Sequence, residues 1–343
     1  MQLILHIGTE KTGSTAIQER LEGQRGDLAD HGLLLPDFLN SSNHRALASV
    51  FMRNDLDDDY LRALKLVEPA ARARHRDQLF RNLEAHVNRH PDARALVISA
   101  EHFHSRLLHQ DEVNAFADRI KPLFDDIKII CYLRRQDHMA LSFYTQKLRA
   151  GFIPPTILPV PNIRRLRPAL PLFFDFEALL ERWSVAFGDA AIEPAVYARS
   201  ALIGGDVLHD FFARIQFPLA AEDEDAKANQ SLSSAGQMAL LAFNRERGGD
   251  LPERTAARDE RERLSAYLQR HAAGKGVTPS VEEATEFLAA FDDSNRSVAR
   301  RWFEREELFP ADLGSAGECV VAPDHDGAEA LLRLFREQDR VRV

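Results

Sequence analysis

The chain has 343 residues, of which 45% are hydrophobic and 28% charged, so it can bury a large core and is neither disordered nor fibrous. Its 44 Lys and Arg residues against 53 Asp and Glu residues give a formal net charge of −9. This balance disfavours bulk attraction to nucleic acid or to an anionic membrane, and we expect neither as a partner.

Two cysteines, Cys131 and Cys319, lie far apart in the sequence and cannot form a disulfide framework, which favours a reducing compartment. The sequence begins directly with a predicted strand, without a basic segment followed by an apolar one. No run of about 18 apolar residues occurs that could cross a membrane. We therefore expect a soluble, cytoplasmic protein.

The first predicted element is a short buried strand at residues 3–7, bounded by Gly8, and a helical pattern begins at Thr15 after a polar turn. A strand that turns through glycines into a helix N-terminus presents free backbone N–H groups and the positive end of the helix dipole. We therefore expect a phosphate or sulfate group to bind at this turn.

Apolar runs alternate with helical patterns along the next 200 residues. Further strands are predicted at 33–35, 94–99, 127–133 and 191–197, and Pro194 favours an edge position or a strand start for the last of them. Helices are predicted from the turn to about residue 31, as one or two surface helices within 54–90, and at 111–124, 137–149, 176–187 and 206–215. We expect the arginines of 54–90 to form a solvated face.

The remainder is mostly helical, with predicted helices at 231–246, 256–271, 280–291 and 295–305. The pattern therefore predicts an α/β fold: a parallel sheet with helices on both faces in a core of about 1–215, then a helical part of about 216–343. Residues 151–171 contain six prolines with Arg164, Arg165 and Arg167, and are either a lid or binding loop or a surface excursion.

The turn after the first strand reads Gly8-Thr9-Glu10-Lys11-Thr12-Gly13-Ser14-Thr15. It has the spacing of a nucleotide-triphosphate P-loop, but Ser14 stands where such a loop has its lysine, and Lys11 comes three residues early. Lys11, Thr12, Gly13, Ser14 and Thr15 resemble the 5′-phosphosulfate loop of sulfotransferases that use 3′-phosphoadenosine 5′-phosphosulfate (PAPS). An ordinary strand-to-helix turn is the alternative for this stretch alone.

A second motif follows the strand at 127–133. The sulfotransferase family holds the 3′-phosphate with an arginine at a strand end and a serine eight residues later, and Arg134 and Ser142 have that spacing. Arg135 is the alternative if the register slips by one. A guanidinium can bind two phosphate oxygens at once, and a serine hydroxyl adds another donor. An exposed arginine pair at a strand end is the alternative for this segment alone.

Glu101 and His102 follow the strand at 94–99, where the family has its catalytic base, and either could take a proton from an acceptor hydroxyl. On a continuing strand the two side chains would face opposite ways, so only one would be the base, with Glu101 as first choice. The resemblance also suggests that Tyr197 contacts the adenine, although a core tyrosine is the alternative. A zinc site at His102, His104 and His109 is not supported by the spacing.

The resemblance implies a single P-loop-like sulfotransferase domain over 1–343, of the bacterial cytoplasmic type. It implies in-line transfer of a sulfuryl group from PAPS to a hydroxyl or amine of a small-molecule or glycan acceptor, leaving adenosine 3′,5′-bisphosphate, with no metal required. Two alternatives are an ATP-dependent P-loop kinase and a non-catalytic adenine-nucleotide-binding module. A kinase should have a lysine at Ser14 and a magnesium-binding carboxylate at a strand end.

Overall fold

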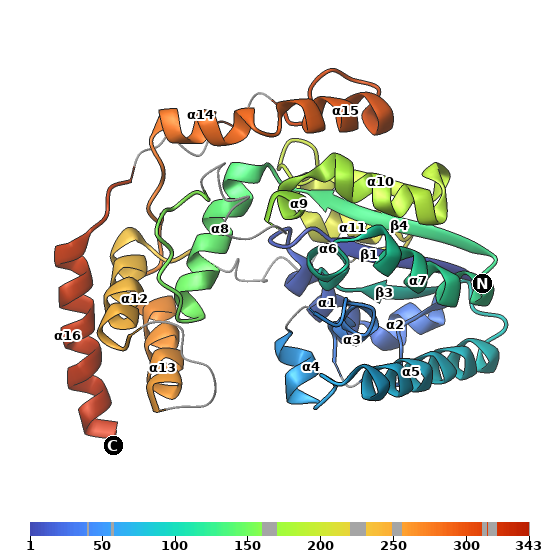
Figure 1. The fold of residues 1–343 in the computed structure, drawn as a ribbon, viewed down its shortest axis with the longest axis horizontal. Helices are drawn as coiled ribbons and strands as arrows, with labels where there is room; N and C mark the ends of the chain where they lie inside the picture. Colours follow the sequence, from blue (N-terminus) through green and yellow to red (C-terminus); the bar gives the residue numbers. More distant parts are fainter. Residues whose placement is uncertain are drawn as a thin grey trace. The chain divides into compact units, whose positions relative to one another are not determined.

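The computed structural model describes residues 1–39, 41–55, 58–159, 170–219, 231–248, 256–310, 314 and 321–342. The chain divides into two compact units (Figure 1). The first comprises Met1–Arg135, Arg164–Ala221 and Phe291–Leu313, and the second comprises Gln136–Ile163, Glu222–Ala290 and Gly314–Val343. The single domain expected over 1–343 stays a prediction.

The first unit is built on a parallel sheet of five strands in the order β2-β3-β1-β4-β5. The strands are β1 (Gln2–Gly8), β2 (Leu33–Leu34), β3 (Ala95–Ser99), β4 (Asp126–Leu133) and β5 (Ile192–Val196). Pro194 has no N–H to donate to a ladder, and β5 occupies an edge as that residue predicts. The predicted α/β fold with a parallel sheet is confirmed.

Helices flank both faces of the sheet (Figure 1). In this unit they are α1 (Ser14–Gly23), α2 (Arg25–Asp30), α3 (Arg45–Ser49), α4 (Asp59–Ala63), α5 (Pro69–Arg89), α6 (His102–Arg106), α7 (Gln110–Ile120), α9 (Leu170–Phe174), α10 (Phe176–Phe187), α11 (Val207–Arg214) and α15 (Asp292–Phe303). Ile17 of α1 and Phe211 of α11 belong to one buried cluster with Ile4 of β1. Phe103, Phe116 and Trp183 join α6, α7 and α10 through tilted and edge-on ring contacts.

Two sequence expectations for this unit are wrong. The helix expected to run from the turn to about residue 31 is divided at Gln24, whose backbone leaves the helical region at φ −108° and ψ 20°. The arginines of 54–90 do not all lie on a solvated face, because Arg72 of α5 is buried and donates to backbone carbonyl groups. The sequence around Arg72 did not predict its burial, because the carbonyl groups that accept its hydrogen bonds belong to the segment before α5.

The second unit is helical in its described part: α8 (Gln136–Arg149), α12 (Ser234–Glu246), α13 (Ala256–His271), α14 (Val281–Ala289) and α16 (His325–Arg342). Leu148, Phe243, Leu268 and Phe335 share its buried cluster. Helix α16 was not expected from the sequence. Arg164, Arg165 and Arg167 lie outside the described residues.

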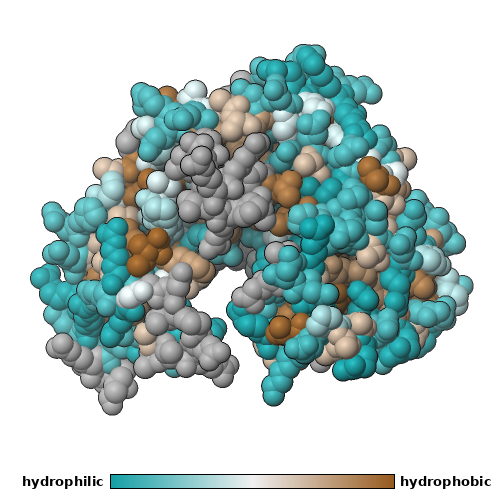
Figure 2. Space-filling model, viewed as in Figure 1, coloured by the Kyte–Doolittle hydropathy of each residue, from teal (hydrophilic) through white to brown (hydrophobic). Residues whose placement is uncertain are grey.

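The face of the molecule in Figure 2 is mainly hydrophilic, and apolar residues appear on it as small separate patches. Scattered exposed apolar residues of this kind are normal in folded proteins and mark no particular site. Among the residues described, no helix has the combination of length and apolar composition needed to span a bilayer.

Candidate functional site

Three predicted motifs meet at one edge of the sheet. Strands β3, β1 and β4 are adjacent and parallel, so their carboxyl ends lie side by side. The turn at residues 9–13 follows β1, Glu101 follows β3, and Arg134 follows β4. Ligands of open α/β sheets gather beyond this edge.

The turn is held to the neighbouring strand by its first residue. Both the backbone N–H and the hydroxyl of Thr9 donate to the carbonyl oxygen of Tyr132, at 2.8 and 3.0 Å. The Thr12 hydroxyl donates to the Thr9 carbonyl oxygen at 2.6 Å, so this side chain fixes the shape of the turn. Lys11 adopts a left-handed backbone conformation, with φ 68°.

Gly13 makes the junction between the turn and α1. Its φ of 79° is left-handed, and a Cβ atom there would lie 2.8 Å from Cγ1 of Val207. Only glycine fits this position without a shift of its surroundings. The chain then enters α1 at Ser14, and the first backbone N–H groups of a helix have no acceptor within it.

The hydroxyl of Ser14 is a second feature of the turn that suits the binding of an anion. Its hydroxyl oxygen is buried and has no hydrogen-bond partner within the described part of the chain. A buried hydroxyl without a partner is costly unless a ligand satisfies it. Thr15, one residue later, is exposed. The helix N-terminus and the Ser14 hydroxyl together offer donors suited to an anion.

Arg134 links the turn to the last strand. Its Nη1 atom donates to the carbonyl oxygen of Lys11 at 2.7 Å, and its guanidinium carbon lies 5.6 Å from the centroid of the Tyr197 ring. Tyr197 directly follows β5, and its Oη and Cε2 atoms would lie 3.7 and 3.8 Å from a Cβ atom on Gly13. Lys11, Gly13, Arg134 and Tyr197 thus lie together.

Glu101 lies against the start of the same turn. A Cβ atom on Gly8, whose φ is 99°, would come within 3.1 Å of the Glu101 Cα atom, so this glycine permits the close approach. The expectation that Glu101 and His102 continue a strand is wrong, because Glu101 is the N-cap residue of the short helix α6. Their side chains do not point to opposite sides: His102 Nδ1 is 3.9 Å from Glu101 Oε1.

Two amide side chains donate to the Glu101 carboxylate. Gln18 Nε2 lies 2.8 Å from Oε2, and Asn43 Nδ2 lies 3.1 and 3.2 Å from the two oxygens. Sequence reasoning missed both residues. Gln18 is one helical turn after Ser14, so the predicted helix could have placed it on the same face, whereas nothing in the pattern around Asn43 signals its position.

His102 is neutral at physiological pH. Burial lowers its pKa below that of a free histidine, and the nearby Glu101 charge offsets only part of that effect. Its Nδ1 atom is buried and makes no hydrogen bond to any residue the structure describes. A neutral imidazole can accept a proton, so His102 and Glu101 both have the chemistry of a base.

His104, by contrast, has both ring nitrogens engaged. Nδ1 accepts from the Glu10 backbone N–H at 3.4 Å, and Nε2 lies 2.9 Å from the Phe173 carbonyl oxygen. Burial lowers its pKa to about 3. Across the described ranges, no group of three His, Cys, Asp or Glu side chains is arranged to hold a metal ion.

Ser142 lies on α8, which belongs to the second unit, whereas Arg134 belongs to the first. The pairing of these two residues on one phosphate group therefore stays a prediction. The other residues expected to form the site, from Lys11 to Thr15 with Glu101, His102, Arg134 and Tyr197, all belong to the first unit.

Comparison with known proteins gives two similarities. An uncharacterised protein of Archaeoglobus fulgidus is 27% identical over 219 residues, which are 62% of this chain and 52% of that protein. The chain thus spans about half the length of this curated relative. A crystal structure of a sulfotransferase from Alicyclobacillus acidocaldarius aligns with 88% of this chain and 95% of its own, at 12% identity and a TM-score of 0.44. No family model matches the chain.

Proposed function

We propose that this chain is a PAPS-dependent sulfotransferase, which moves a sulfuryl group to a hydroxyl or amine of a small-molecule or glycan acceptor. The observation that carries the proposal is the contact between Arg134 and the Lys11 carbonyl group at 2.7 Å. The two motifs that the sequence assigns to opposite ends of one adenosine bisphosphate are therefore neighbours across the β1 and β4 strand ends.

The residues present suit the donor. Lys11, the N–H groups of residues 13–15 and the Ser14 hydroxyl would hold the 5′-phosphosulfate, and Arg134 with Ser142 would hold the 3′-phosphate. Tyr197, beside Gly13 and Arg134, would contact the adenine. When bound, PAPS supplies an activated sulfuryl group. No metal is required by this scheme.

In this scheme Lys11 and the α1 N-terminus stabilise the transition state of sulfuryl transfer. Negative charge develops on the leaving phosphate oxygen as the sulfuryl group is transferred. Cations and N–H donors already aimed at that position stabilise the transition state more than the ground state. The turn is held in place by Thr9 and Thr12, so these donors are positioned before the reaction.

Glu101 is our first choice for the base that takes the acceptor proton, and His102 is the second. Gln18 and Asn43 fix the orientation of the Glu101 carboxylate, which leaves its position well defined at the strand end. His102 stands 3.9 Å from the same carboxylate and would be the base if its Nε2 atom faces the acceptor.

A thermal-shift comparison tests the proposal against the two alternatives. Adenosine 3′,5′-bisphosphate should raise the melting temperature in the absence of magnesium, and Mg·ATP at the same concentration should have a smaller effect. A larger shift with Mg·ATP would favour a kinase. Sulfate transfer from labelled PAPS to a panel of hydroxyl and amine acceptors then distinguishes an enzyme from a binding module.

Lys11→Ala separates catalysis from binding in the same assay. Loss of one preorganised donor to a developing charge costs about 10²–10³ in kcat. We expect such a loss of sulfate transfer with a much smaller change in the affinity for adenosine 3′,5′-bisphosphate. Equal turnover of the variant and the wild type would contradict the proposed mechanism.

A further inference from the structure

The two amide side chains that donate to the Glu101 carboxylate are both connected to the last residue of β3. That residue, Ser99, is fully buried. Its hydroxyl contacts Gln18, and its backbone groups bind His44, the residue after Asn43. Burying polar groups costs free energy unless they form hydrogen bonds, and the hydrogen bonds of Ser99 converge on the candidate base.

The Gln18 amide donates in two directions. Its Nε2 atom lies 2.8 Å from Glu101 Oε2 and 3.4 Å from Ser99 Oγ. An amide nitrogen carries two hydrogens, so each oxygen can accept one of them. Rotating the amide by half a turn would point its carbonyl oxygen at the carboxylate and lose both contacts. Ser99 therefore helps to fix the atom of Gln18 that faces Glu101.

His6 contacts the same hydroxyl from the core of the sheet. Its Nδ1 atom lies 2.8 Å from Ser99 Oγ, and the two residues are partners in the pairing of β1 with β3. Burial lowers the pKa of His6 to about 4, so the ring is neutral at physiological pH. The Ser99 hydroxyl thus has a partner on each side, which holds it in place for Gln18.

His44 binds the main chain of Ser99 at two points. The Ser99 backbone N–H donates to His44 Nδ1 at 3.0 Å, and the His44 backbone N–H donates to the Ser99 carbonyl oxygen at 3.1 Å. Asn43 directly precedes His44, and its Nδ2 atom lies 3.1 and 3.2 Å from the two Glu101 oxygens. The two bonds between His44 and Ser99 therefore fix the main chain from which Asn43 reaches Glu101.

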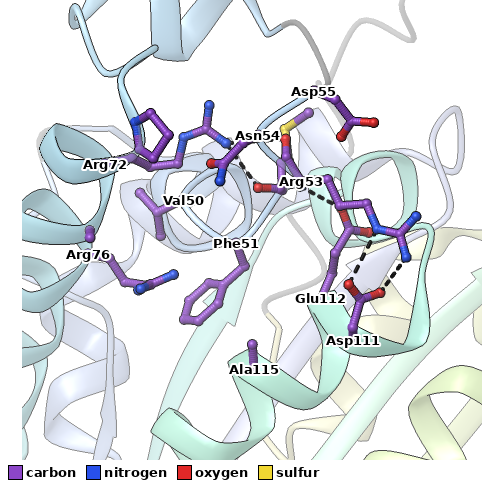
Figure 3. Close-up of a pocket in the computed structure, with 13 residues that line it drawn as sticks. Val50, Phe51, Arg53, Asn54, Asp55, Arg72, Arg76, Asp111, Glu112 and Ala115 are labelled. Atoms are coloured by element: carbon purple, nitrogen blue, oxygen red, sulfur yellow. Dashed lines mark hydrogen bonds and ion pairs between the residues drawn. The ribbon is translucent and has the colours of Figure 1, made fainter.

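Helix α3, which begins directly after His44, is also anchored beyond its other end. The segment 50–55 that follows it lines a cavity of about 650 Å³ together with α5 and α7 (Figure 3). In that segment Arg53 donates its backbone N–H to Glu112 at 2.8 Å, and its guanidinium pairs with Asp111 at 2.8 Å. The chain is thus fixed on both sides of α3, which keeps His44 in position.

We propose that Ser99 and His44 are positioning residues for the candidate base Glu101. They act through the Gln18 and Asn43 amides, which set the direction of the carboxylate. The proposal rests on the proposed sulfotransferase function, in which Glu101 takes the acceptor proton. Neither Ser99 nor His44 is assigned a contact with the substrate. Holding a reacting group in one orientation raises the rate because less of the barrier is spent on finding the reactive geometry.

Ser99→Ala tests the proposal through the rate of sulfate transfer. Loss of the hydroxyl should lower kcat about threefold to tenfold, the usual effect of losing one neutral hydrogen bond. The affinity for adenosine 3′,5′-bisphosphate should stay within about twofold, since Ser99 does not belong to the turn before α1. Ser49→Ala is the matched control and should keep the wild-type kcat. Ser49 of α3 is also fully buried, and its hydroxyl has no hydrogen-bond partner among the described residues.

A second measurement separates positioning from a general effect on folding. In Gln18→Leu the connection between Ser99 and Glu101 is already broken, so adding Ser99→Ala should lower kcat less than about twofold. His44→Asn should keep kcat within about twofold of the wild type, because asparagine Oδ1 can accept the Ser99 N–H in place of the imidazole. His44→Leu has no such acceptor and should lower kcat at least about threefold.

Urea denaturation tests the contact without any activity, in the wild type, Ser99→Ala, Gln18→Leu and the double variant. The decrease in midpoint caused by Ser99→Ala should be smaller in Gln18→Leu than in the wild type. The proposal is overturned if the midpoints decrease additively, if Ser99→Ala keeps the kcat of an active wild type, or if it lowers kcat equally in both backgrounds. No sulfate transfer by the wild type, with non-additive midpoints, would refute the proposed function and with it the catalytic role of these contacts.

Discussion

The Nη1 atom of Arg134 donates a 2.7 Å hydrogen bond to the carbonyl oxygen of Lys11. These residues are 123 positions apart in sequence, and they meet because β1 and β4 are hydrogen-bonded neighbours that run in the same direction. A guanidinium is a planar group of five N–H donors, and the contact to the turn fixes its position relative to Lys11. The guanidinium therefore lies beside the turn that follows β1, and the proposed function assigns it to the 3′-phosphate.

Replacing Arg134 by glutamine should weaken adenosine 3′,5′-bisphosphate binding by tenfold or more, because a charge-assisted contact to a phosphate is worth about 1.5–3 kcal/mol. Isothermal titration calorimetry measures this change. Arg135→Gln is the matched control, since it removes the same charge one residue later. A larger loss of affinity in Arg135→Gln would transfer the phosphate-binding role to Arg135.

Glu101→Gln should lower the rate of sulfate transfer about 10²-fold or more, while leaving bisphosphate affinity almost unchanged. Glutamine keeps the shape of the side chain but cannot take a proton. His102→Asn should have the smaller effect if Glu101 is the base. The measurement is kcat for the wild type and both variants under saturating donor and acceptor, and the reverse order would make His102 the base.

Much of the sheet could be predicted because its strands are short apolar runs followed by turn residues. Pro194 even indicated an edge strand, since a missing N–H is a local property of the sequence. The Lys11 turn and Arg134 could be singled out for the same reason: each directly follows a strand, and parallel strands place such residues at one edge.

Contacts made between distant segments were not predictable from local patterns. Arg72 looked like one of several helix-surface arginines, but carbonyl groups of the segment before α5 surround it. Asn43 reaches Glu101 from a stretch with no regular pattern. The strand assumed to continue through Glu101 ends at Ser99, and the short helix α6 begins at His102 with Glu101 as its N-cap residue. The Glu101 and His102 side chains therefore do not point to opposite sides.

Replacing Gly8 or Gly26 by alanine should change the free energy of unfolding in opposite directions. At Gly8 the φ of 99° disfavours any side chain, and the new Cβ atom would lie 3.1 Å from the Glu101 backbone, so Gly8→Ala should destabilise the fold by about 1–3 kcal/mol. Gly26 lies within α2 with open space around it, so Gly26→Ala should stabilise by about 0.4–1 kcal/mol. Urea denaturation of the two variants checks the signs, and destabilisation by both would contradict this account.

Three buried histidines should make the fold sensitive to mild acid. Burial lowers the pKa of His6 and of His44 to about 4 and that of His104 to about 3, against 6.5 for a free histidine. His6 and His44 also meet at Ser99, whose hydroxyl lies 2.8 Å from His6 Nδ1 and whose backbone N–H donates to His44 Nδ1 at 3.0 Å. All three are neutral in the folded protein at pH 6, whereas the unfolded chain already binds protons there.

Because the unfolded state binds more protons, the free energy of unfolding should fall as the pH decreases from about 6.5 toward about 4. Each of these histidines contributes a slope of up to about 1.4 kcal/mol per pH unit in that window. Urea denaturation at pH 7.5, 6.5, 5.5 and 4.5 measures the decrease. His6→Gln should make the free energy of unfolding less dependent on pH, by the contribution of one histidine, because glutamine does not titrate. A free energy of unfolding that stays constant from pH 6.5 to 5 would show that these imidazoles do not remain neutral in the folded state.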